Sequence, residues 1–409
     1  MILCIVGGKL QGIEAAYLAR KAGYRTILVD KKPDPPAKLL VDEFYNMDVN
    51  EEEFLRIAKN CDAILPANEN YRTLKHLEKI CNKIGVIFLQ DNSSFLISSN
   101  KLSSIALFKK IGVLYPETYT IGDTIRESNN IKYPVILKPV SKSGGEGVRI
   151  IKNASELEEL LEELQRNNLE NEFFFQKYIN GPLLSIEVIS TTKKITPLFI
   201  TSFEVDEAFS CKRVIFPAIL PYKDREYLIN SAVKLARGLK LRGLMDIQAI
   251  YGIGGESCGN IYTMEINARL PSQTPTVVYN ATGVNMLKIL WKVFSGQDVP
   301  KFRSDTYSNK KVVIYQHIWI KDRVIYIIGE RAVSTSKNLS IEKNFFGSEA
   351  ITNLTFPEDK CFKQEGVATL IVKSNSYSKA YSKLYETLDC ILREYKAKKI
   401  VESNVNLKF

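Results

Sequence analysis

The stretch YTMEINARLP, residues 262–271, has the pattern of a β-strand from a protein interior, yet it carries three strongly polar side chains. Glu265, Asn267 and Arg269 stand two residues apart, and side chains two apart in a strand point to the same face. The opposite face is apolar and consists of Met264, Ile266, Ala268 and Leu270. One face is therefore expected to pack in the interior, while the other takes part in chemistry or faces water.

A second strand with the same alternation precedes it. In GLMDIQAIYG, residues 243–252, Asp246 and Gln248 share one face. If the two strands pair as an antiparallel hairpin, Gln248, Glu265 and Asn267 converge on one point. Side-chain oxygens together with phosphate oxygens are the ligands that Mg²⁺ prefers, and a nearby arginine can stabilise a transferring phosphoryl group. The alternative is a hairpin whose polar face is simply solvated.

A glycine-rich turn joins two further predicted strands in YPVILKPVSKSGGEGVRIIKN, residues 133–153. Backbone N–H groups of such a turn can approach phosphate oxygens closely, and Lys138 and Lys142 add positive charge. The turn is not a Walker P-loop, because it leads into a strand and lacks the GxxxxGK[ST] pattern. The alternative is a mobile hairpin tip. Two neighbours favour a nucleotide: Lys101 in the first turn of a predicted helix, where the dipole disfavours a cation, and the polar segment QKYIN, residues 176–180.

The first ninety residues alternate predicted strands with helices, a pattern typical of a parallel α/β sheet. Gly7, Gly8 and Gly12 follow the first strand, and Asp30 ends the second. This arrangement raises a dinucleotide-binding interpretation. However, GGKLQG departs from GxGxxG, and a tight strand-to-helix turn explains the glycines equally well.

Composition limits the remaining classes of function. A chain of 409 residues suggests two to four domains, and seven scattered cysteines without a CxxC pair fit reduced thiols in a cytoplasmic protein. With two histidines, any metal is expected on oxygen ligands. We expect no membrane span, because no segment has the roughly 18 unbroken apolar residues required. The net charge of +10 is spread along the chain, so we expect anionic small molecules and no nucleic acid as partners.

The start of one helix can also be predicted. Ser155 and Glu158 have capping-box spacing at the start of the acidic helix in ASELEELLEELQRN, residues 154–167.

The segment 301–409 shows three further strands and a last helix, and we expect it to form a small α/β domain. A contribution to a homodimer is one option for this segment, which offers no defined site.

In order, these motifs resemble those of the ATP-grasp superfamily of carboxylate–amine ligases: NKL, ILKPVSKSGGEGV, QKYINGP, GLMDIQ and MEINARLP. The resemblance covers about residues 1–300 and implies an α/β protein, α+β overall, with the ATP-grasp fold. The domains would be a Rossmann-like domain (1–95), a lid subdomain with the glycine-rich loop (96–175), an antiparallel-sheet core with the metal site (176–300) and the C-terminal domain (301–409). The cofactors implied are ATP and two Mg²⁺ ions.

The resemblance also implies roles for particular residues. ATP would be bound by Lys101, Lys138, Ser143, Gly144, Gly145, Gly147, Gln176, Lys177, Ile179 and Glu187. Magnesium would be bound by Gln248, Glu265, Asn267 and Asp246, and the catalytic residues would be Arg269, Lys138 and Asp246. Two positions depart from the family pattern. Gln248 stands where many relatives have a carboxylate, and Leu183 stands where an acidic residue is common, which leaves Glu187 as the expected ribose partner.

More narrowly, GGKLQG, LPANEN and EINARLPSQTPT resemble the ligases of pyrrolysine biosynthesis, which join 3-methyl-D-ornithine to L-lysine. This implies 3-methylornithine or ornithine and L-lysine as small-molecule substrates, an acyl phosphate intermediate, and attack by an ε-amine assisted by Asp246 or Glu69. Substrate contacts would come from Leu10, Gln11, Gly12, Glu69, Arg269, Ser272 and Thr274. Glu69 can equally be a carboxylate favoured by a helix N-terminus.

Three other functions remain open from the sequence. A biotin-carboxylase-like or purine-pathway relative would use bicarbonate through carboxyphosphate and keep the same phosphate chemistry. A dinucleotide-dependent oxidoreductase is supported only by the first glycine turn and Asp30. A non-catalytic nucleotide-binding protein would bind ATP without turnover, which the combined lysine, metal-ligand and arginine set argues against.

Overall fold

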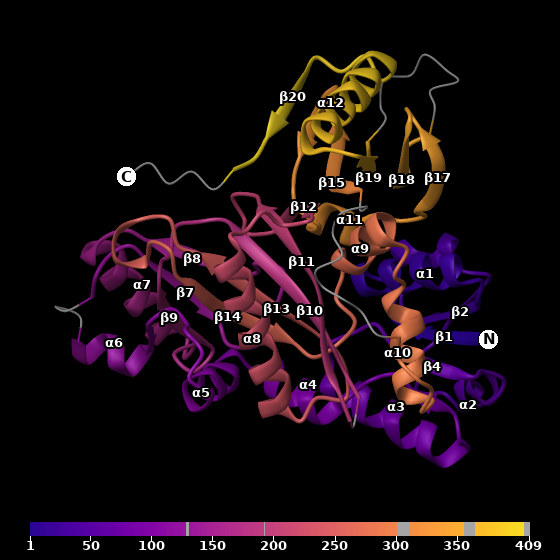
Figure 1. Ribbon diagram of the computed structural model, residues 1–409, viewed down its shortest axis with the longest axis horizontal. Coiled ribbons are helices and arrows are strands. Elements are labelled where there is room, and N and C mark those ends of the chain that lie inside the picture. The colour runs from indigo at the N-terminus through magenta and orange to yellow at the C-terminus, as the bar shows by residue number, and fades with distance from the viewer. Residues whose placement is uncertain (128–130, 192, 301–310, 356–364, 405–409) are drawn as a thin grey trace.

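The computed structural model describes residues 1–127, 131–191, 193–300, 311–355 and 365–404. Its strands form a five-stranded, a four-stranded and an eleven-stranded sheet. In Figure 1 the four-stranded sheet lies at the left, the five-stranded sheet at the right and the C-terminal strands at the top, with the long strands of the largest sheet between them.

The five-stranded sheet is parallel, as the alternation of strands and helices predicts, with the order β3-β2-β1-β4-β5. Its strands are β1 (Ile2–Val6), β2 (Arg25–Asp30), β3 (Glu43–Asn46), β4 (Ala63–Pro66) and β5 (Ile87–Phe88). Its helices are α1 (Leu10–Ala22), the 3₁₀ helix η1 (Pro36–Leu40), α2 (Glu52–Lys59) and α3 (Tyr71–Ile84). The central strands are almost wholly apolar because helices cover both faces of the sheet.

Two short helices connect this sheet to the next one. The predicted helix near Asn100 is α5 (Lys101–Ile111), and the Asn100 side chain caps it by accepting from the backbone N–H of Ser103 at 2.9 Å. An unpredicted helix, α4 (Asn92–Ser98), precedes it and is capped by Asp91. Each cap is an extended residue with a side-chain acceptor, so the chain forms two helices at an angle instead of one.

The four-stranded sheet is antiparallel, with the order β6-β9-β7-β8. It consists of β6 (Thr118–Thr120), β7 (Val135–Pro139), β8 (Arg149–Ile151) and β9 (Phe173–Lys177), with helices α6 (Ile121–Glu127) and α7 (Ala154–Arg166). The glycine-rich loop joins β7 to β8, as predicted. The predicted capping box is wrong by two residues: Asn153 is the extended cap and accepts from the N–H of Glu156, whose carboxylate accepts from the N–H of Lys152.

The eleven-stranded sheet follows the order β14-β13-β10-β11-β12-β15-β19-β18-β17, and β16 pairs with β15 and β20. Its first strands are β10 (Leu183–Ser190), β11 (Ile195–Val205), β12 (Cys211–Phe216), β13 (Gly243–Tyr251) and β14 (Ile261–Asn267). The later strands are β15 (Val312–Lys321), β16 (Val324–Ile327), β17 (Ser340–Phe345), β18 (Ser348–Thr352), β19 (Gly366–Ser374) and β20 (Lys399–Glu402). The helices are α8 (Tyr222–Leu239), η3 (Gly255–Ser257), α9 (Thr274–Thr282), α10 (Met286–Phe294), α11 (Arg331–Thr335) and α12 (Tyr377–Glu394).

The C-terminal segment, which we expect to form a small α/β domain, shares a sheet with the strands that precede it. β15 hydrogen-bonds to β12 on one side and to β19 on the other, so the strands after residue 311 continue the sheet of the preceding segment. Pairing with β15 satisfies the second edge of β12, because the backbone N–H and C=O groups at that edge would otherwise be unpaired. Parts of the expected domain, residues 301–310, 356–364 and 405–409, lie outside the described residues.

The polar hairpin forms as an antiparallel pair of strands, which brings its polar residues together. β13 and β14 are antiparallel, with Gln248 opposite Glu265 and Asp246 opposite Asn267. A β-bulge leaves Met264 without a partner on β13. Met264 therefore faces the cavity described below, although the simple alternation of the strand places it on the packed face.

One hydrophobic core joins the five-stranded sheet to the largest sheet. It contains Leu3 and Ile5 of β1, Val277 of α9, Leu287 of α10 and Val313 of β15. In Figure 1, helix α1 lies against α9 and α10, so the two sheets are packed as one body.

The described helices all lack the combination of length and apolar character needed to cross a bilayer. Cys4, Cys61, Cys81, Cys211, Cys258 and Cys390 are free thiols, and Cys361 lies outside the described residues.

Candidate active site

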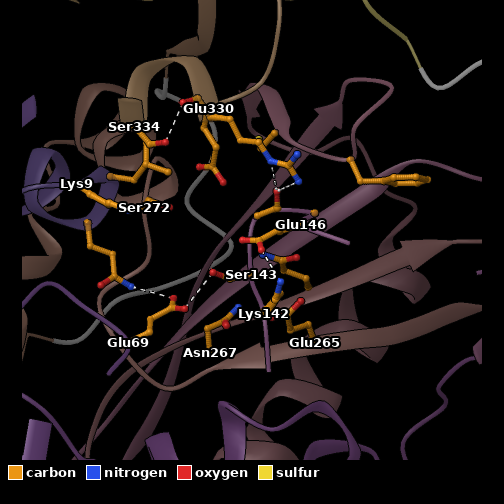
Figure 2. Close-up of a pocket in the computed structure, with 18 of the residues that line it drawn as sticks. Lys9, Glu69, Lys142, Ser143, Glu146, Glu265, Asn267, Ser272, Glu330 and Ser334 are labelled. Carbon is orange, nitrogen blue, oxygen red and sulfur yellow. Dashed lines mark hydrogen bonds and ion pairs between the residues drawn. The ribbon is translucent and has the colours of Figure 1, made fainter. Parts of the chain in front are cut away.

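A cavity of about 1290 Å³ lies where the three sheets meet. Its wall includes loops that follow strands of the five-stranded sheet, the glycine-rich loop, and strands β13 and β14. Figure 2 shows Glu69, Ser143, Glu265 and Asn267 arranged around this cavity, with Lys9, Ser272, Glu330 and Ser334 beside them. A cavity of this size accommodates a nucleotide together with further small molecules.

The N-terminal wall follows from the topology, because the carboxyl ends of parallel strands meet at one edge of their sheet. Leu10 and Gln11, the expected substrate contacts of this segment, line the cavity. Gly12 does not line it; an added Cβ there would stand 2.2 Å from the carbonyl oxygen of Gly7, so Gly12 lets the turn and helix α1 approach each other. The Asp30 carboxylate accepts from the Gly8 N–H at 2.7 Å and so holds the same turn.

Lys101, the first residue of α5, and Lys138 of β7 provide positive charge in the cavity. Lys138 donates to the Gln176 side chain at 2.8 Å, and burial lowers its pKa to about 8 despite the Glu265 carboxylate. Lys101 lies 3.7 Å from the Glu265 carboxylate and also donates to the backbone carbonyl of Lys142. Both ammonium groups face one part of the cavity, which suits an anion such as a phosphate chain.

The segment after β9 forms another part of the wall. Gln176, Lys177 and Ile179, which we expect to bind ATP, all line the cavity. The Gln176 side chain accepts from Lys138 and donates to Thr118 at 3.0 Å, while Lys177 pairs with Glu256 at 3.1 Å. Because both side chains already have partners, the groups left for a ligand are mainly on the backbone.

The three expected metal ligands on the hairpin, Gln248, Glu265 and Asn267, line the cavity. Asp246 does not: it is 3% exposed and accepts from the Asn267 side-chain amide at 3.2 Å. Burial raises the pKa of Asp246 to about 6, although Arg269 opposes this shift. The Asn267 amide nitrogen is thus directed at Asp246, which leaves its oxygen for the cavity.

This donor set fits magnesium. A carboxylate and two amide oxygens are hard ligands, and Mg²⁺ is usually bound by one or two carboxylates together with substrate phosphates and water. Among the described residues, no group of three His, Cys, Asp or Glu side chains suggests a metal held by the protein alone.

A cluster around Glu69 connects three segments. The Glu69 carboxylate lies 2.8 Å from the Arg269 guanidinium, accepts from the Ser143 hydroxyl at 3.0 Å and accepts from the Gln11 amide at 3.3 Å. Burial raises the pKa of Glu69, but Arg269 and Ser143 outweigh it, and the net shift is downward. Glu69 therefore stays ionised at neutral pH.

Three further predicted residues lie outside the cavity wall, namely Gly147, Glu187 and Thr274. The ribose role expected of Glu187 does not fit, because its side chain is fully buried beside Asp246 on the neighbouring strand, whereas Leu183 of β10 lines the cavity. Thr274 is buried as the first residue of α9, whereas Ser272 lines the cavity.

Sequence reasoning missed Glu330 and Arg331, which follow β16 and line the cavity. Glu330 is 9% exposed; burial raises its pKa to about 7, and the Gln273 side chain, which donates to it, lowers the pKa less than burial raises it. No motif marked these residues, which belong to the C-terminal segment, where the sequence offers no defined site.

Comparison with known proteins agrees with this arrangement. A family model described as "PylC-like, N-terminal domain" matches residues 3–89, and one described as "Carbamoyl-phosphate synthase L chain, ATP binding domain" matches residues 101–302. The chain is 35% identical over 335 residues to the 3-methyl-D-ornithine–L-lysine ligase of Methanosarcina barkeri, covering 81% of this chain and 84% of that protein. The chain belongs to the ATP-grasp carboxylate–amine ligases.

The corresponding ligase of Methanosarcina mazei is 33% identical over 337 residues, which cover 81% of this chain and 82% of that protein. Solved structures confirm the ATP-grasp fold. The biotin carboxylase domain of 2-oxoglutarate carboxylase from Hydrogenobacter thermophilus has a TM-score of 0.72 at 20% identity and covers 95% of this chain and 89% of its own. The ADP complex of N5-carboxyaminoimidazole ribonucleotide synthetase has a TM-score of 0.68 at 16% identity and covers 95% and 96%.

Membership of this family makes the chain an enzyme of the carboxylate–amine ligase type, which forms amides. ATP-grasp enzymes use ATP and Mg²⁺, and the fit of the hairpin ligands to magnesium agrees with this.

Proposed function

We propose that this enzyme joins the carboxylate of 3-methyl-D-ornithine, or of ornithine, to the ε-amine of L-lysine through an acyl phosphate. The ligases of Methanosarcina, which carry these two substrates in their names, support the choice of substrates. The "PylC-like" match over residues 3–89 supports it further, because residues of this domain, among them Gln11 and Glu69, line the cavity.

The observation that carries the proposal is the division of charge in the cavity. Lys101, Lys138 and Arg269 provide cations for phosphates and a substrate carboxylate. Glu69 and Glu330 provide carboxylates, which suit the ammonium groups of amino acids. Bicarbonate has no ammonium group, so these carboxylates favour an amino-acid substrate over the bicarbonate alternative.

The proposed ATP site uses the groups around the four-stranded sheet. Lys101, Lys138 and the backbone N–H groups of residues 143–145 would contact phosphates, and the backbone of residues 176–179 would contact adenine. Gln248, Glu265 and Asn267 would hold magnesium, which when bound neutralises charge on the phosphates. Glu265 is the one carboxylate among these three ligands, so a second ion would depend mainly on phosphate oxygens and water.

The first step would form a bond between a carboxylate oxygen of the substrate and the γ-phosphorus, and ADP would leave. Arg269 would hold the carboxylate and stabilise the charge that develops on the transferred group. In the second step the amine nitrogen would attack the acyl carbon, and phosphate would leave. The amide keeps the amine nitrogen, which loses two protons in all. The departing phosphate can accept the proton lost as the amide forms, whereas the proton that the ammonium must lose before it attacks requires a base.

Glu330 is the best-placed group to take this proton. An ε-ammonium has an unperturbed pKa of about 10.4 and must lose a proton before it can attack. Asp246, expected as a base from the sequence, lies behind Asn267 and does not reach the cavity. Glu69 does reach it, but its ion pair with Arg269 makes it a weak base. Glu330 lines the cavity with a pKa of about 7.

The experiment is ADP release by the purified chain with ATP and magnesium. L-lysine plus D-ornithine is compared with bicarbonate, and the product is identified by mass spectrometry. The proposal predicts ADP together with a product at the summed mass of the two amino acids less water. Turnover with bicarbonate alone would contradict it. Gel filtration in the same preparation would test the proposed homodimer, which is supported by the dimer that the Hydrogenobacter biotin carboxylase domain forms.

A further inference from the structure

The glycine-rich loop is held by several parts of the molecule at consecutive residues. The Lys142 carbonyl accepts from Lys101, and the Ser143 hydroxyl donates to Glu69 at 3.0 Å. The next residue, Gly144, is held from the C-terminal segment. Its carbonyl accepts from Nε of Arg331 at 3.2 Å and from Nη2 at 3.0 Å. None of the family motifs found in the sequence includes Arg331.

Arg331 also contacts the turn between β11 and β12, residues 206–210. Its Nη2 also donates to the Ala208 carbonyl, at 3.4 Å, in the turn between β11 and β12. The buried Asp206 carboxylate holds this turn, because it accepts from the N–H groups of Ala208 and Ser210, both at 2.9 Å. Asp206 also accepts from the Gly329 N–H at 2.8 Å, so the turn and the segment that carries Arg331 are joined.

The glycine-rich loop packs against the turn between β11 and β12 at Gly145. Gly145 has φ +72°, and a Cβ added to it would stand 2.4 Å from the carbonyl oxygen of Phe209. Any side chain at this position would therefore separate the loop from the turn. The docked position thus depends on a glycine at residue 145 and on the Arg331 hydrogen bonds to the preceding residue.

We propose that Arg331 is a positioning residue that latches the glycine-rich loop over the reaction centre and so couples ATP consumption to amide formation. The proposal rests on the proposed function, because an acyl phosphate must be protected. If a water oxygen attacks the acyl carbon, phosphate leaves, the carboxylate is regenerated, a proton is released and the net reaction is ATP hydrolysis. A loop held closed excludes water until the amine attacks.

Arg331 also lies next to Glu330, the group proposed to take a proton from the substrate amine. Glu330, the preceding residue, lines the cavity where the amine is proposed to lose its proton. An added Cβ at Gly144 would lie 3.5 Å from the Glu330 carboxylate, so the loop passes directly over this group. A substrate ammonium at Glu330 would thus lie under the part of the loop that Arg331 holds.

The test compares Arg331→Ala and Arg331→Lys with wild type. Arg149→Ala is the matched control. Arg149 is the first residue of β8, the strand into which the glycine-rich loop leads, and its ion pair with Glu163 is exposed and away from the cavity. ADP and amide are measured in the same reaction. Wild type and the control should release about one ADP per amide. Arg331→Ala loses charged hydrogen bonds, so the open form of the loop should be populated roughly tenfold more. The ratio of ADP to amide should therefore rise severalfold. Arg331→Lys should restore part of the coupling.

A second measurement does not require amide formation. Hydrogen exchange of peptides covering residues 142–147, with ATP and magnesium present, should be about tenfold faster in Arg331→Ala than in the control variant. Gly145→Ala should have the same effect by preventing docking. An unchanged ADP-to-amide ratio with unchanged exchange in both loop variants would overturn the latch. If wild type made no amide while Arg331→Ala still loosened the loop, the proposed substrates would fail and the latch would stand.

Discussion

Replacing Lys138 with methionine should stabilise the ligand-free protein while removing its activity. Lys138 is half-buried on β7, burial lowers the pKa of its ammonium, and its neighbours include a second cation, Lys101. Methionine has nearly the same volume and carries no charge, so it removes the cost of desolvation without leaving a cavity. An ATP phosphate would compensate this cost in the wild type, which is why the charge is retained.

The magnitude follows from the pKa of Lys138, which burial lowers from 10.5 to about 8. The interval between these values corresponds to about 3 kcal/mol of destabilisation at pH 7. The folded-state pKa lies below the unfolded value, so between about pH 8 and 10.5 the unfolded chain binds a proton that the folded chain lacks. This contribution therefore makes the wild type more stable as pH rises through that window. The Gln176 carbonyl oxygen loses its donor in the variant, which costs about 1–2 kcal/mol independently of pH.

The assay is the difference in Tm between Lys138→Met and wild type from pH 7 to pH 10.5. For a chain of this length 1 kcal/mol corresponds to about 1 °C, so the advantage of the variant should fall by about 3 °C over this range. ATP with magnesium should raise the Tm of the wild type only. A Tm difference that does not change with pH would refute the argument that Lys138 is a desolvated cation.

Three other predictions concern the carboxylates. Glu265→Gln should lower the rate of ADP release about tenfold or more at saturating magnesium with an unchanged Tm, because it removes the charge of the proposed metal ligand; wild-type ADP release would contradict this role. Glu69→Gln should raise the KM for the amino-acid substrates about tenfold through loss of the charge paired with Arg269, and unchanged initial-rate kinetics would exclude substrate contact. Glu14→Ala should lower the free energy of unfolding by about 2–4 kcal/mol, because two buried N–H groups at the start of α9 lose their acceptor. Denaturant unfolding measures this change, with Glu14→Gln as the milder control. Equal free energies of unfolding for wild type and Glu14→Ala would show that these bonds contribute nothing.

Much of the fold was predictable because local patterns were strong. Alternating strands and helices predicted the parallel sheet. Two strands with polar residues at the same spacing suggested the antiparallel hairpin, in which the structure pairs Gln248 with Glu265. The extent of the largest sheet was not predictable, because the pairing of β12 with β15 joins residues about a hundred positions apart. Helix α9 was also missed, since its apolar pattern is short and its first residues resemble a substrate-binding segment.

The candidate site was predicted best where a motif places a side chain directly. The motif residues that line the same cavity are Lys101, Lys138, Glu265, Asn267 and Arg269. Residues placed by inference from neighbours were predicted less well: Asp246 and Glu187 lie on suitable strands, but tertiary packing buries both beneath the cavity wall. Whether a polar residue faces a cavity or lies behind its wall depends on contacts that spacing alone does not reveal.

The most direct test of the account is the fate of the carboxylate oxygen. D-ornithine labelled with ¹⁸O in its carboxylate is incubated with L-lysine, ATP, magnesium and the enzyme, and the products are examined by mass spectrometry. An acyl phosphate intermediate predicts one ¹⁸O in the released phosphate and one in the amide carbonyl for each ADP formed. Unlabelled phosphate, or label in AMP, would contradict the proposed mechanism.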